Sequence, residues 1–333
     1  MKKTLLTICL VWMCFSLSAQ KIIDLSGKWS FSIDRQDNGE KEKWFSHTLN
    51  DFINLPGSMP EKLKGDEVTA KTQWTGSLYD SSYYYNPYME KYRKEGNIKF
   101  PFFLTPDKHY VGAAWYQKEV NIPADWKGER ILLFLERPHI ETTVWVNGQK
   151  TGMQNSLCVP HQYDITRYVR PGKCTITIRV DNRIKEINVG PDSHSITDQT
   201  QGNWNGIVGR ICLQTTPKTY FDDIQIYPEP EQKLARVKVV IKGTGTAKVK
   251  LSAESFNTDK KHIVPAIQQE IKLNKGVTET EMVLPMGNDM LLWDEFHPAL
   301  YKLKAEVTNG KKTEIKEIQF GIRRFEIKGK WFY

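Results

Sequence analysis

After the first twenty residues, apolar and polar side chains of this chain alternate with a period of two. Residues 174–181 show the alternation most clearly. The apolar set, which we expect to face a core, is Cys174, Ile176, Ile178 and Val180, and the polar set, which we expect to face solvent, is Thr175, Thr177, Arg179 and Asp181. Successive side chains of a strand point to opposite faces, so the pattern predicts a strand with one buried face. Cys174 is then a small core residue rather than a reactive thiol.

The same pattern predicts further strands in the first two thirds of the chain. They lie at residues 23–33, 114–123, 130–135 and 142–149. The last of these ends in Asn147-Gly148, a strong hairpin signal, because both residues of such a turn must tolerate positive φ. No amphipathic helical stretch of ordinary length interrupts these strands. The sequence therefore predicts an all-β sandwich.

Two prolines and two acids break the pattern at residues 227–231 and predict a domain boundary there. Short strands recur beyond it, at residues 237–241, 247–253, 267–273, 278–284, 300–307 and 313–320. Asn309-Gly310 joins the last pair as a second hairpin signal. Strands this short, at this spacing, over about one hundred residues are typical of a small immunoglobulin-like sandwich. We assign residues 229–327 to it.

Residues 65–110 lose the alternation and accumulate aromatic side chains. These are Trp74, Tyr79, Tyr83, Tyr84, Tyr85, Tyr88 and Tyr92. An insertion of this length without clear elements is usually functional or packed over an edge. We expect most of the rings to pack against the sandwich and one or two to reach a ligand.

Residues 197–210 combine amides, one carboxylate, a large aromatic ring and three glycines between two predicted strands. The candidate substrate-binding residues are Asp198, Gln199, Gln201, Asn203, Trp204 and Asn205. Their planar donors and acceptors suit a hydroxyl-rich ligand, and the indole ring of Trp204 could stack on a sugar face. A second interpretation remains open, in which the segment is a glycine-rich turn and Trp204 fills a gap between sheets.

The first nineteen residues have the pattern of an export signal. Lys2 and Lys3 precede a mainly apolar run at residues 4–15, and small residues at 17–19 provide a cleavage site before Gln20. The run is too short to span a membrane. Residues 1–19 are therefore predicted to be a cleaved signal peptide, and the mature protein to be soluble and periplasmic or secreted, with no membrane span.

Net charge and cysteine content limit the kinds of partner and site that we expect. Removal of the signal lowers the formal net charge from +8 to +6, because it takes away two lysines and no acids. The remaining lysines are spread along the chain, so nucleic acid is not an expected partner. Cys158, Cys174 and Cys212 remain after cleavage, and their spacing indicates neither a disulfide framework nor a metal site. No cofactor is expected.

Catalytic motifs are missing from the sequence. It contains no Gly-x-Ser-x-Gly elbow and no Cys-x-x-Cys pair. Asp294 and Glu295 are neighbours, which in a strand would point to opposite faces. His139 and His297 each adjoin a proline and are interpreted as turn or edge residues rather than bases. Asp198 alone cannot run a two-carboxylate glycosidase mechanism, so the loop predicts recognition rather than catalysis.

Several short stretches, in this order and spacing, make the mature chain resemble the non-catalytic front half of a family 2 glycoside hydrolase, the family of β-galactosidases, β-glucuronidases and β-mannosidases. The stretches are Leu25-Ser26-Gly27-Lys28-Trp29-Ser30-Phe31, Ala114-Trp115-Tyr116-Gln117-Lys118-Glu119-Val120, Val144-Trp145-Val146-Asn147-Gly148, Asp164-Ile165-Thr166, Val180-Asp181-Asn182, Asn203-Trp204-Asn205-Gly206-Ile207, Leu292-Trp293, Pro298-Ala299-Leu300-Tyr301 and Phe320-Gly321-Ile322-Arg323-Arg324-Phe325.

This resemblance implies a jelly-roll (galactose-binding-like) sugar-binding domain at residues 20–228, followed by the immunoglobulin-like domain and then a catalytic (β/α)₈ barrel. Residues 328–333 would begin the lead-in to the barrel, which this sequence lacks together with both catalytic glutamates. Asp198 best matches the acidic residue that such enzymes place beside the terminal sugar. The implied partners are a β-linked carbohydrate and the missing barrel. Two hypotheses follow: part of an exported glycosidase that breaks down polysaccharide or oligosaccharide, or a non-catalytic carbohydrate-binding protein.

Overall fold

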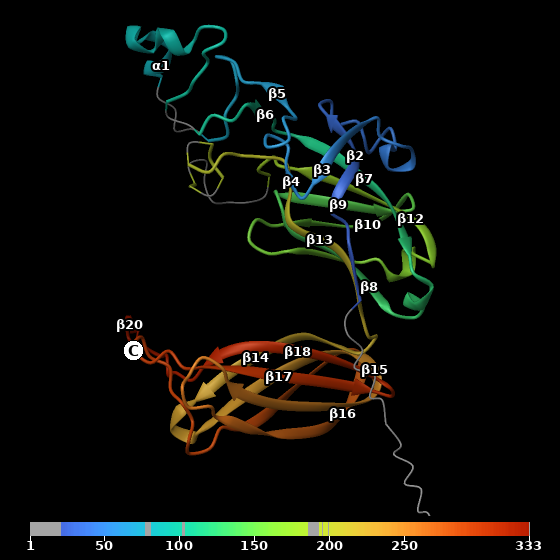
Figure 1. Cartoon of the computed structure of the whole chain (residues 1–333), viewed down its shortest axis with the longest axis vertical. Helices are drawn as coiled ribbons and strands as arrows, with labels where there is room; N and C mark the ends of the chain where they lie inside the picture. Colours follow the sequence, from blue (N-terminus) through green and yellow to red (C-terminus); the bar gives the residue numbers. More distant parts are fainter. Residues whose placement is uncertain are drawn as a thin grey trace, which may run out of the picture. The chain divides into compact units, whose positions relative to one another are not determined.

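The computed structural model describes residues 21–76, 81–101, 104–185, 193–194, 196–198 and 200–332. The predicted signal peptide therefore lies outside the described residues. The described chain forms two compact units, divided between Thr215 and Thr216 (Figure 1). β-strands are the main element of both units and helices are few and short, which confirms the predicted all-β class.

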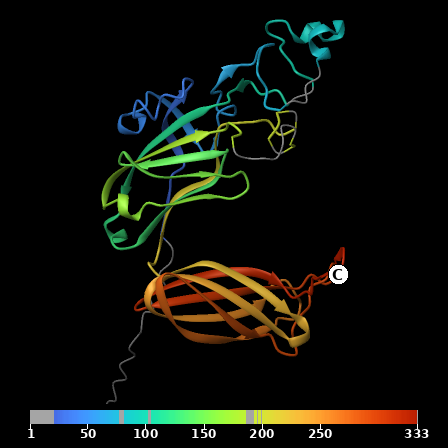
Figure 2. The same ribbon diagram turned by 180° about the vertical axis from the view of Figure 1, so that it is seen from behind.

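The first unit is a sandwich of two main sheets (Figures 1 and 2). One sheet has the order β1 (Ile22–Asp24), β13 (Gly206–Thr216), β8 (Arg130–Pro138) and β11 (His161–Asp164), with β4 (Gly57–Ser58) also paired to β13. The other has the order β10 (Gln149–Asn155), β9 (Glu141–Val146), β12 (Gly172–Asp181), β7 (Ala113–Ile122), β2 (Gly27–Asp34) and β3 (Asp51–Leu55). Short 3-10 turns are η1 (Trp44–Ser46), η3 (Ala124–Trp126) and η4 (Thr166–Tyr168). The paired strands of both sheets are antiparallel.

The core of the first unit lies between these sheets. Cys174, Ile176, Ile178 and Val180 of β12 are buried in it, which confirms the predicted inward face of that strand. Trp29 and Phe31 of β2, Tyr116 of β7, Leu133 of β8 and Ile207 of β13 are in the same cluster. Burial of side chains of this size provides the main driving force for sandwich formation, at roughly 1.5–3 kcal/mol for each large apolar side chain.

The predicted outward face of β12 is not exposed, and this prediction was wrong. Thr177, Arg179 and Asp181 are all buried. The segment that follows β2 covers this face: Asp37 binds Arg179, and the backbone carbonyl of His47 accepts a hydrogen bond from the Gln117 side chain beside Thr177. A smaller aromatic cluster completes the cover, formed by Trp44, Phe45, Leu49, Trp115 and Trp145.

The aromatic insertion between β4 and β7 contains only short elements, namely β5 (Asp66–Glu67), α1 (Ser82–Tyr85), η2 (Pro87–Tyr92) and β6 (Lys108–His109). It projects from the first unit (Figure 1) and has a small core of its own around Tyr83 and Phe100, with Trp74 and Tyr92 packed against it. Other tyrosines do not pack: Tyr85 is 70% exposed and Tyr88 is 84% exposed. Tyr79 lies outside the described residues.

The second unit is formed around two long strands, β15 (Leu234–Ser255) and β16 (Ile263–Pro285). Its sheet order is β14 (Tyr220–Glu229), β15, β17 (Leu300–Asn309) and β18 (Lys312–Gly321), with β16 also paired to β15. The remaining elements are η5 (Pro230–Gln232), β19 (Ile327–Lys328) and β20 (Trp331–Phe332). Residues 227–231, where the sequence predicted a domain boundary, form the end of β14 and part of η5.

No helix among the described residues is long and apolar enough to cross a membrane. The three cysteines are unpaired, with Cys174 and Cys212 buried and Cys158 exposed. Burial raises the pKa of the Cys174 thiol to about 11, so this thiol stays protonated at neutral pH. Its role as a core residue is confirmed.

The hairpin between β9 and β10 provides a test of the turn geometry. Asn147 and Gly148 both have positive φ, at 50° and 76°, and an added Cβ on Gly148 would meet nothing within 4 Å. We expect Gly148→Ala to cost about 1–2 kcal/mol, because the left-handed conformation strains any side chain.

Gly152→Ala is the matched control, since its backbone is not in the left-handed region and its Cβ would lie at an ordinary 3.6 Å from Tyr163. It should change the stability of the first unit by less than about 0.5 kcal/mol. Urea unfolding followed by tryptophan fluorescence would measure both variants. Equal losses would show that positive φ at Gly148 is not the limiting feature.

Candidate functional site

The candidate loop follows β12 and leads into β13, and Asp198 is its most buried charged residue. Only 2% of Asp198 is exposed. Its carboxylate accepts hydrogen bonds from the backbone N–H of Asn203, at 2.5 Å, and from that of Thr75, at 2.6 Å. His109 Nε2 lies 3.4 Å from the same carboxylate. Asp198 therefore joins the loop to the start and the end of the aromatic insertion.

Asn203 and Asn205 are also buried, and their amides are hydrogen-bonded within the chain. Asn203 donates to Thr75 Oγ1 and to the Asn182 carbonyl, and it accepts from the Asn182 side chain, each at 3.0 Å. Asn205 donates to the carbonyls of Gly112 and Val180, both at 2.9 Å. Its Oδ1 accepts from the Tyr116 hydroxyl at 2.7 Å. Buried amides need such partners, and here they fix the loop against β7 and β12.

Trp204 lies at the edge of this network and is half-buried. Its ring stacks on His139, with ring centroids 4.6 Å apart and planes inclined by 23°. His139 Nδ1 donates to the Trp204 carbonyl at 2.8 Å. Gln201 is exposed on the loop, and Gln199 lies outside the described residues.

His139 occupies the turn between β8 and β9, in keeping with its interpretation as a turn or edge residue, and only 8% of it is exposed. Burial lowers the pKa of His139 to about 4, although the Trp204 carbonyl and the nearby Asp198 charge act in the opposite direction. At neutral pH the ring is therefore uncharged. A neutral imidazole can stack on Trp204 without placing an unpaired charge in the interior.

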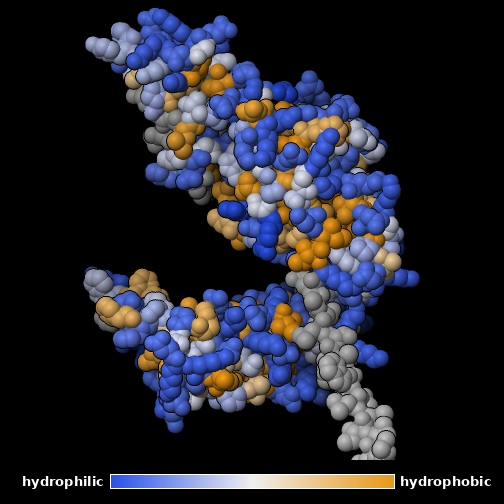
Figure 3. All heavy atoms as spheres, viewed as in Figure 1, coloured by the Kyte–Doolittle hydropathy of each residue, from blue (hydrophilic) through white to orange (hydrophobic). Residues whose placement is uncertain are grey.

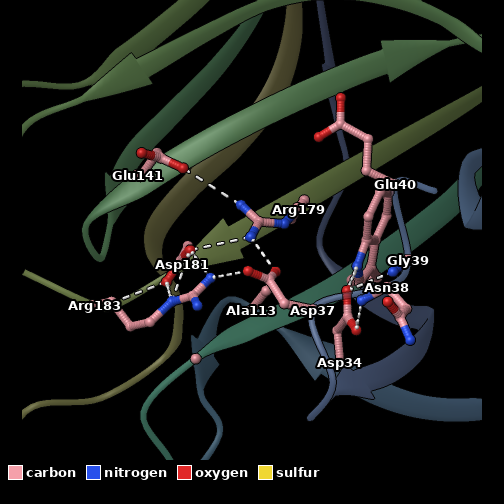
Figure 4. Close-up of polar contacts among 12 residues, drawn as sticks. Asp34, Asp37, Asn38, Gly39, Glu40, Ala113, Glu141, Arg179, Asp181 and Arg183 are labelled. Carbon is pink, nitrogen blue, oxygen red and sulfur yellow. Dashed lines mark hydrogen bonds and ion pairs between the residues drawn. The ribbon is translucent and has the colours of Figure 1, made fainter. Parts of the chain in front are cut away.

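A second polar cluster lies on the covered face of the six-stranded sheet (Figure 4). Asp181 is fully buried and binds three cations: Arg179 at 3.1 Å, Arg183 at 2.6 Å and Lys185 at 2.8 Å. Asp37 binds the two arginines from the covering segment. Burial alone would raise the pKa of Asp181, but hydrogen bonds from Arg183 and Lys185 outweigh it and hold that pKa well below its ordinary value.

Asp181 and its neighbour Asn182 connect the two polar clusters. Asn182 is fully buried, accepts from the Gly112 N–H at 2.8 Å and donates to the Tyr110 carbonyl at 2.9 Å and to Asn203 Oδ1 at 3.0 Å. Asp181, the last residue of β12, and Asn182 after it therefore both use their side chains in ion pairs or hydrogen bonds within the first unit. The predicted loop residues are held in place by partners that the sequence analysis did not identify: Thr75, His109, His139 and Asn182.

The described residues contain no group of three or more histidine, cysteine or acidic side chains arranged to hold a metal ion. Three of the six predicted substrate-binding residues, Asp198, Asn203 and Asn205, are gathered by the structure but use most of their polar atoms to shape the loop. What the loop can present to a ligand is a preformed surface with the Trp204 ring at its edge.

Comparison with known proteins assigns the family. The sugar-binding domain of family 2 glycosyl hydrolases matches residues 22–217, and the family 2 glycosyl hydrolase domain that follows it matches residues 219–323. The chain belongs to glycoside hydrolase family 2, which confirms the resemblance seen in the sequence.

Relatives named for a glycosidase activity are similar to nearly all of this chain. A β-glucuronidase of Paenibacillus borealis is 24% identical over 94% of the chain and 47% of its own length. A β-galactosidase of Clostridium acetobutylicum is 25% identical over 92% of the chain and 32% of its own length. The crystal structure of Ruminococcus gnavus β-glucuronidase, 19% identical, superposes with a TM-score of 0.62 over 95% of this chain and 46% of that one. The chain spans about half the length of most of these relatives, or less.

The pKa of His139 makes stability depend on pH. In the unfolded chain a histidine has a pKa near 6.5, so between pH 6.5 and pH 4 the unfolded state binds more protons and stability falls as pH falls. With a folded pKa of about 4, the loss at pH 5 should be about 2 kcal/mol relative to pH 7. Urea unfolding of the first unit at both pH values should show that His139→Gln reduces this loss.

His297→Gln is the matched control, because His297 lies on the surface of the second unit. It should leave the pH dependence of the first unit unchanged. If His139→Gln also left it unchanged, the loss of stability at low pH would come from groups other than this imidazole.

Substitution of Asp181 tests how much the charge cluster stabilises the first unit. We expect Asp181→Asn to destabilise the first unit by about 3–5 kcal/mol, because Arg179 would lose its fully buried partner and keep its own burial cost. Asp125→Asn removes an exposed ion pair with Lys21 and should produce no measurable change in the same unfolding experiment. Asp37 also pairs with Arg179 and Arg183, and Glu141 pairs with Arg179 at 3.4 Å and Lys185 at 3.0 Å. A small effect of Asp181→Asn would mean that these two carboxylates are enough to balance the three cations.

Proposed function

We propose that this chain is the sugar-recognising front part of an exported glycoside hydrolase that acts on β-linked oligosaccharides or polysaccharides. The observation that carries the proposal is the ordered match of two family 2 domains over residues 22–323. Relatives named β-glucuronidase and β-galactosidase that continue well beyond the matching region support it. In this proposal, the Asp198 loop forms one wall of the pocket for the terminal sugar.

The second wall and the chemistry would come from a catalytic domain. Retaining glycosidases of the usual kind need two carboxyl groups about 5–5.5 Å apart, one as acid/base and one as nucleophile. Asp198 accepts hydrogen bonds from two backbone amides and lies beside His109, so its oxygens hold the loop in place rather than standing free to attack a sugar. The proposal therefore assigns this chain to recognition and positioning.

Exposed aromatic and aliphatic side chains near the C-terminal end support docking of a further domain. They are Phe325, Ile327, Trp331 and Phe332, each more than 60% exposed, around the hairpin of β19 and β20 (Figure 3). Phe325 stacks on Phe332, with ring centroids 5.3 Å apart. Apolar groups gathered in this way commonly mark an interaction surface. We assign this surface to the catalytic domain.

One observation favours a second candidate function, a carbohydrate-binding protein without catalysis. Asn203 and Asn205 have their hydrogen bonds satisfied inside the first unit, so the loop needs no other domain to keep its shape. A protein of this kind would bind an oligosaccharide on its own. Calorimetric titration with galactose- and glucuronic-acid-containing oligomers would reveal such binding.

Activity measurements test the proposed function. The purified chain should not cleave aryl β-galactosides or aryl β-glucuronides, whereas a longer product that carries a catalytic domain encoded downstream should do so. In that longer product Trp204→Ala should raise KM, because the ring at the edge of the loop is lost. Turnover by the present chain that disappears in Asp198→Asn would overturn the proposal, since it would place a catalytic centre inside the β-domains.

A further inference from the structure

A cavity of about 480 Å³ opens in the first unit beside the candidate loop. Its lining comes from the end of β2 and the turn after it, from the beginning of the aromatic insertion, from the segment between β6 and β7, and from Arg183. This volume falls within the usual range of small-molecule sites, about 300–1,000 Å³. All of the lining residues belong to the first unit.

His109 provides a fixed polar group in this cavity. The residue is only 7% exposed, and its ring packs against Trp74, with centroids 4.8 Å apart. Asp198 lies on its Nε2 side, so in the neutral ring this nitrogen carries the proton and Nδ1 is a hydrogen-bond acceptor. Nδ1 has no hydrogen-bond partner among the described residues. Nδ1 is not enclosed by the protein, so it can accept a hydrogen bond from a group in the cavity.

The charges around the cavity are nearly balanced. Arg35 is paired with Asp66 at 2.6 Å, Arg183 with Asp37 at 2.8 Å, and Glu67 with Lys108. Two lining charges have no ion-pair partner among the described residues, and they are of opposite sign. They are Asp34, whose carboxylate accepts from two backbone amides and Trp115, and the exposed Lys71.

One wall of the cavity is apolar. It contains the Tyr110 ring, Val111 and Ala113, and the Tyr110 hydroxyl is already donated to the Ala113 carbonyl at 2.9 Å. A ligand that fits would present hydroxyl groups to the paired charges and to His109, and a C–H face to this wall. Sugar rings have both features, since hydroxyl groups donate and accept while the ring carbons remain apolar.

We propose that this cavity binds one neutral saccharide unit, held by His109 and the surrounding paired charges. The inference rests on the proposed function only in taking the ligand to be a sugar. It adds a site that the first unit forms without a catalytic domain. The affinity for a single unit should be weak, with a dissociation constant of about 1 mM, because few groups are bound in an open cavity.

Calorimetric or NMR titration of the mature chain tests this proposal. The probes are galactose, glucose and mannose, with glucuronic acid and glucosamine as charged analogues of the same size. We expect at least one neutral sugar to bind more tightly than both charged analogues. Tighter binding of glucuronic acid that is lost in Lys71→Ala would overturn the assignment to a neutral ligand.

Two variants locate the binding. Val111→Trp should abolish it, because Val111 is 38% exposed on the cavity wall and an indole would fill the space. Val159→Trp, at a more exposed valine of the same unit that does not line the cavity, should leave it unchanged. His109→Gln retains a donor for Asp198 and removes Nδ1, so affinity should fall about three- to tenfold.

Binding of no saccharide at tens of millimolar, or binding that survives Val111→Trp, would overturn the inference. These results leave the proposed function intact, because hydrolysis by a longer product is measured separately. Conversely, failure of the longer product to hydrolyse any β-glycoside would not affect a site located by Val111→Trp.

Discussion

The arrangement of the first unit depends on the requirement that buried polar groups at the end of β12 find partners. Asp181 and Asn182 are consecutive, and both are fully buried. A buried carboxylate is tolerated only when it is paired and hydrogen-bonded, and a buried amide only when its donors and acceptors are used. Asp181 meets the requirement with Arg179, Arg183 and Lys185, and Asn182 meets it with Gly112, Tyr110 and Asn203.

These partners come from distant parts of the sequence. Through Arg179 and Arg183 the Asp181 cluster holds Asp37, and with it the segment that covers the six-stranded sheet. Through Asn203 the Asn182 cluster holds the candidate loop. Removal of one buried partner from such a network lowers the free energy of unfolding by more than one contact contributes, because the remaining groups stay buried without a partner. The described residues of the loop are therefore held to the rest of the first unit by this network.

The sequence alone predicted those structural features that depend on residues close together in the chain. The alternation in residues 174–181 predicted the inner face of β12, and Asn147-Gly148 predicted the hairpin, because both are local properties of the backbone. It failed for the outer face, since the burial of Arg179 and Asp181 depends on a segment about 140 residues away. For the candidate site, the sequence predicted the loop. It did not predict the contacts of Thr75 and His109, which reach Asp198 through the fold of the insertion.

The same network limits what Asp198 can do for a ligand. An ionised carboxylate offers about four acceptor positions. Asn203 and Thr75 occupy two of them with short bonds of 2.5 Å and 2.6 Å, and His109 approaches a third at 3.4 Å. A sugar hydroxyl that reached Asp198 would thus use the remaining position or compete with His109, which makes the longest of the three contacts. Since His109 also lines the neighbouring cavity, a ligand in the cavity and a hydroxyl at Asp198 would act on the same imidazole from its two sides.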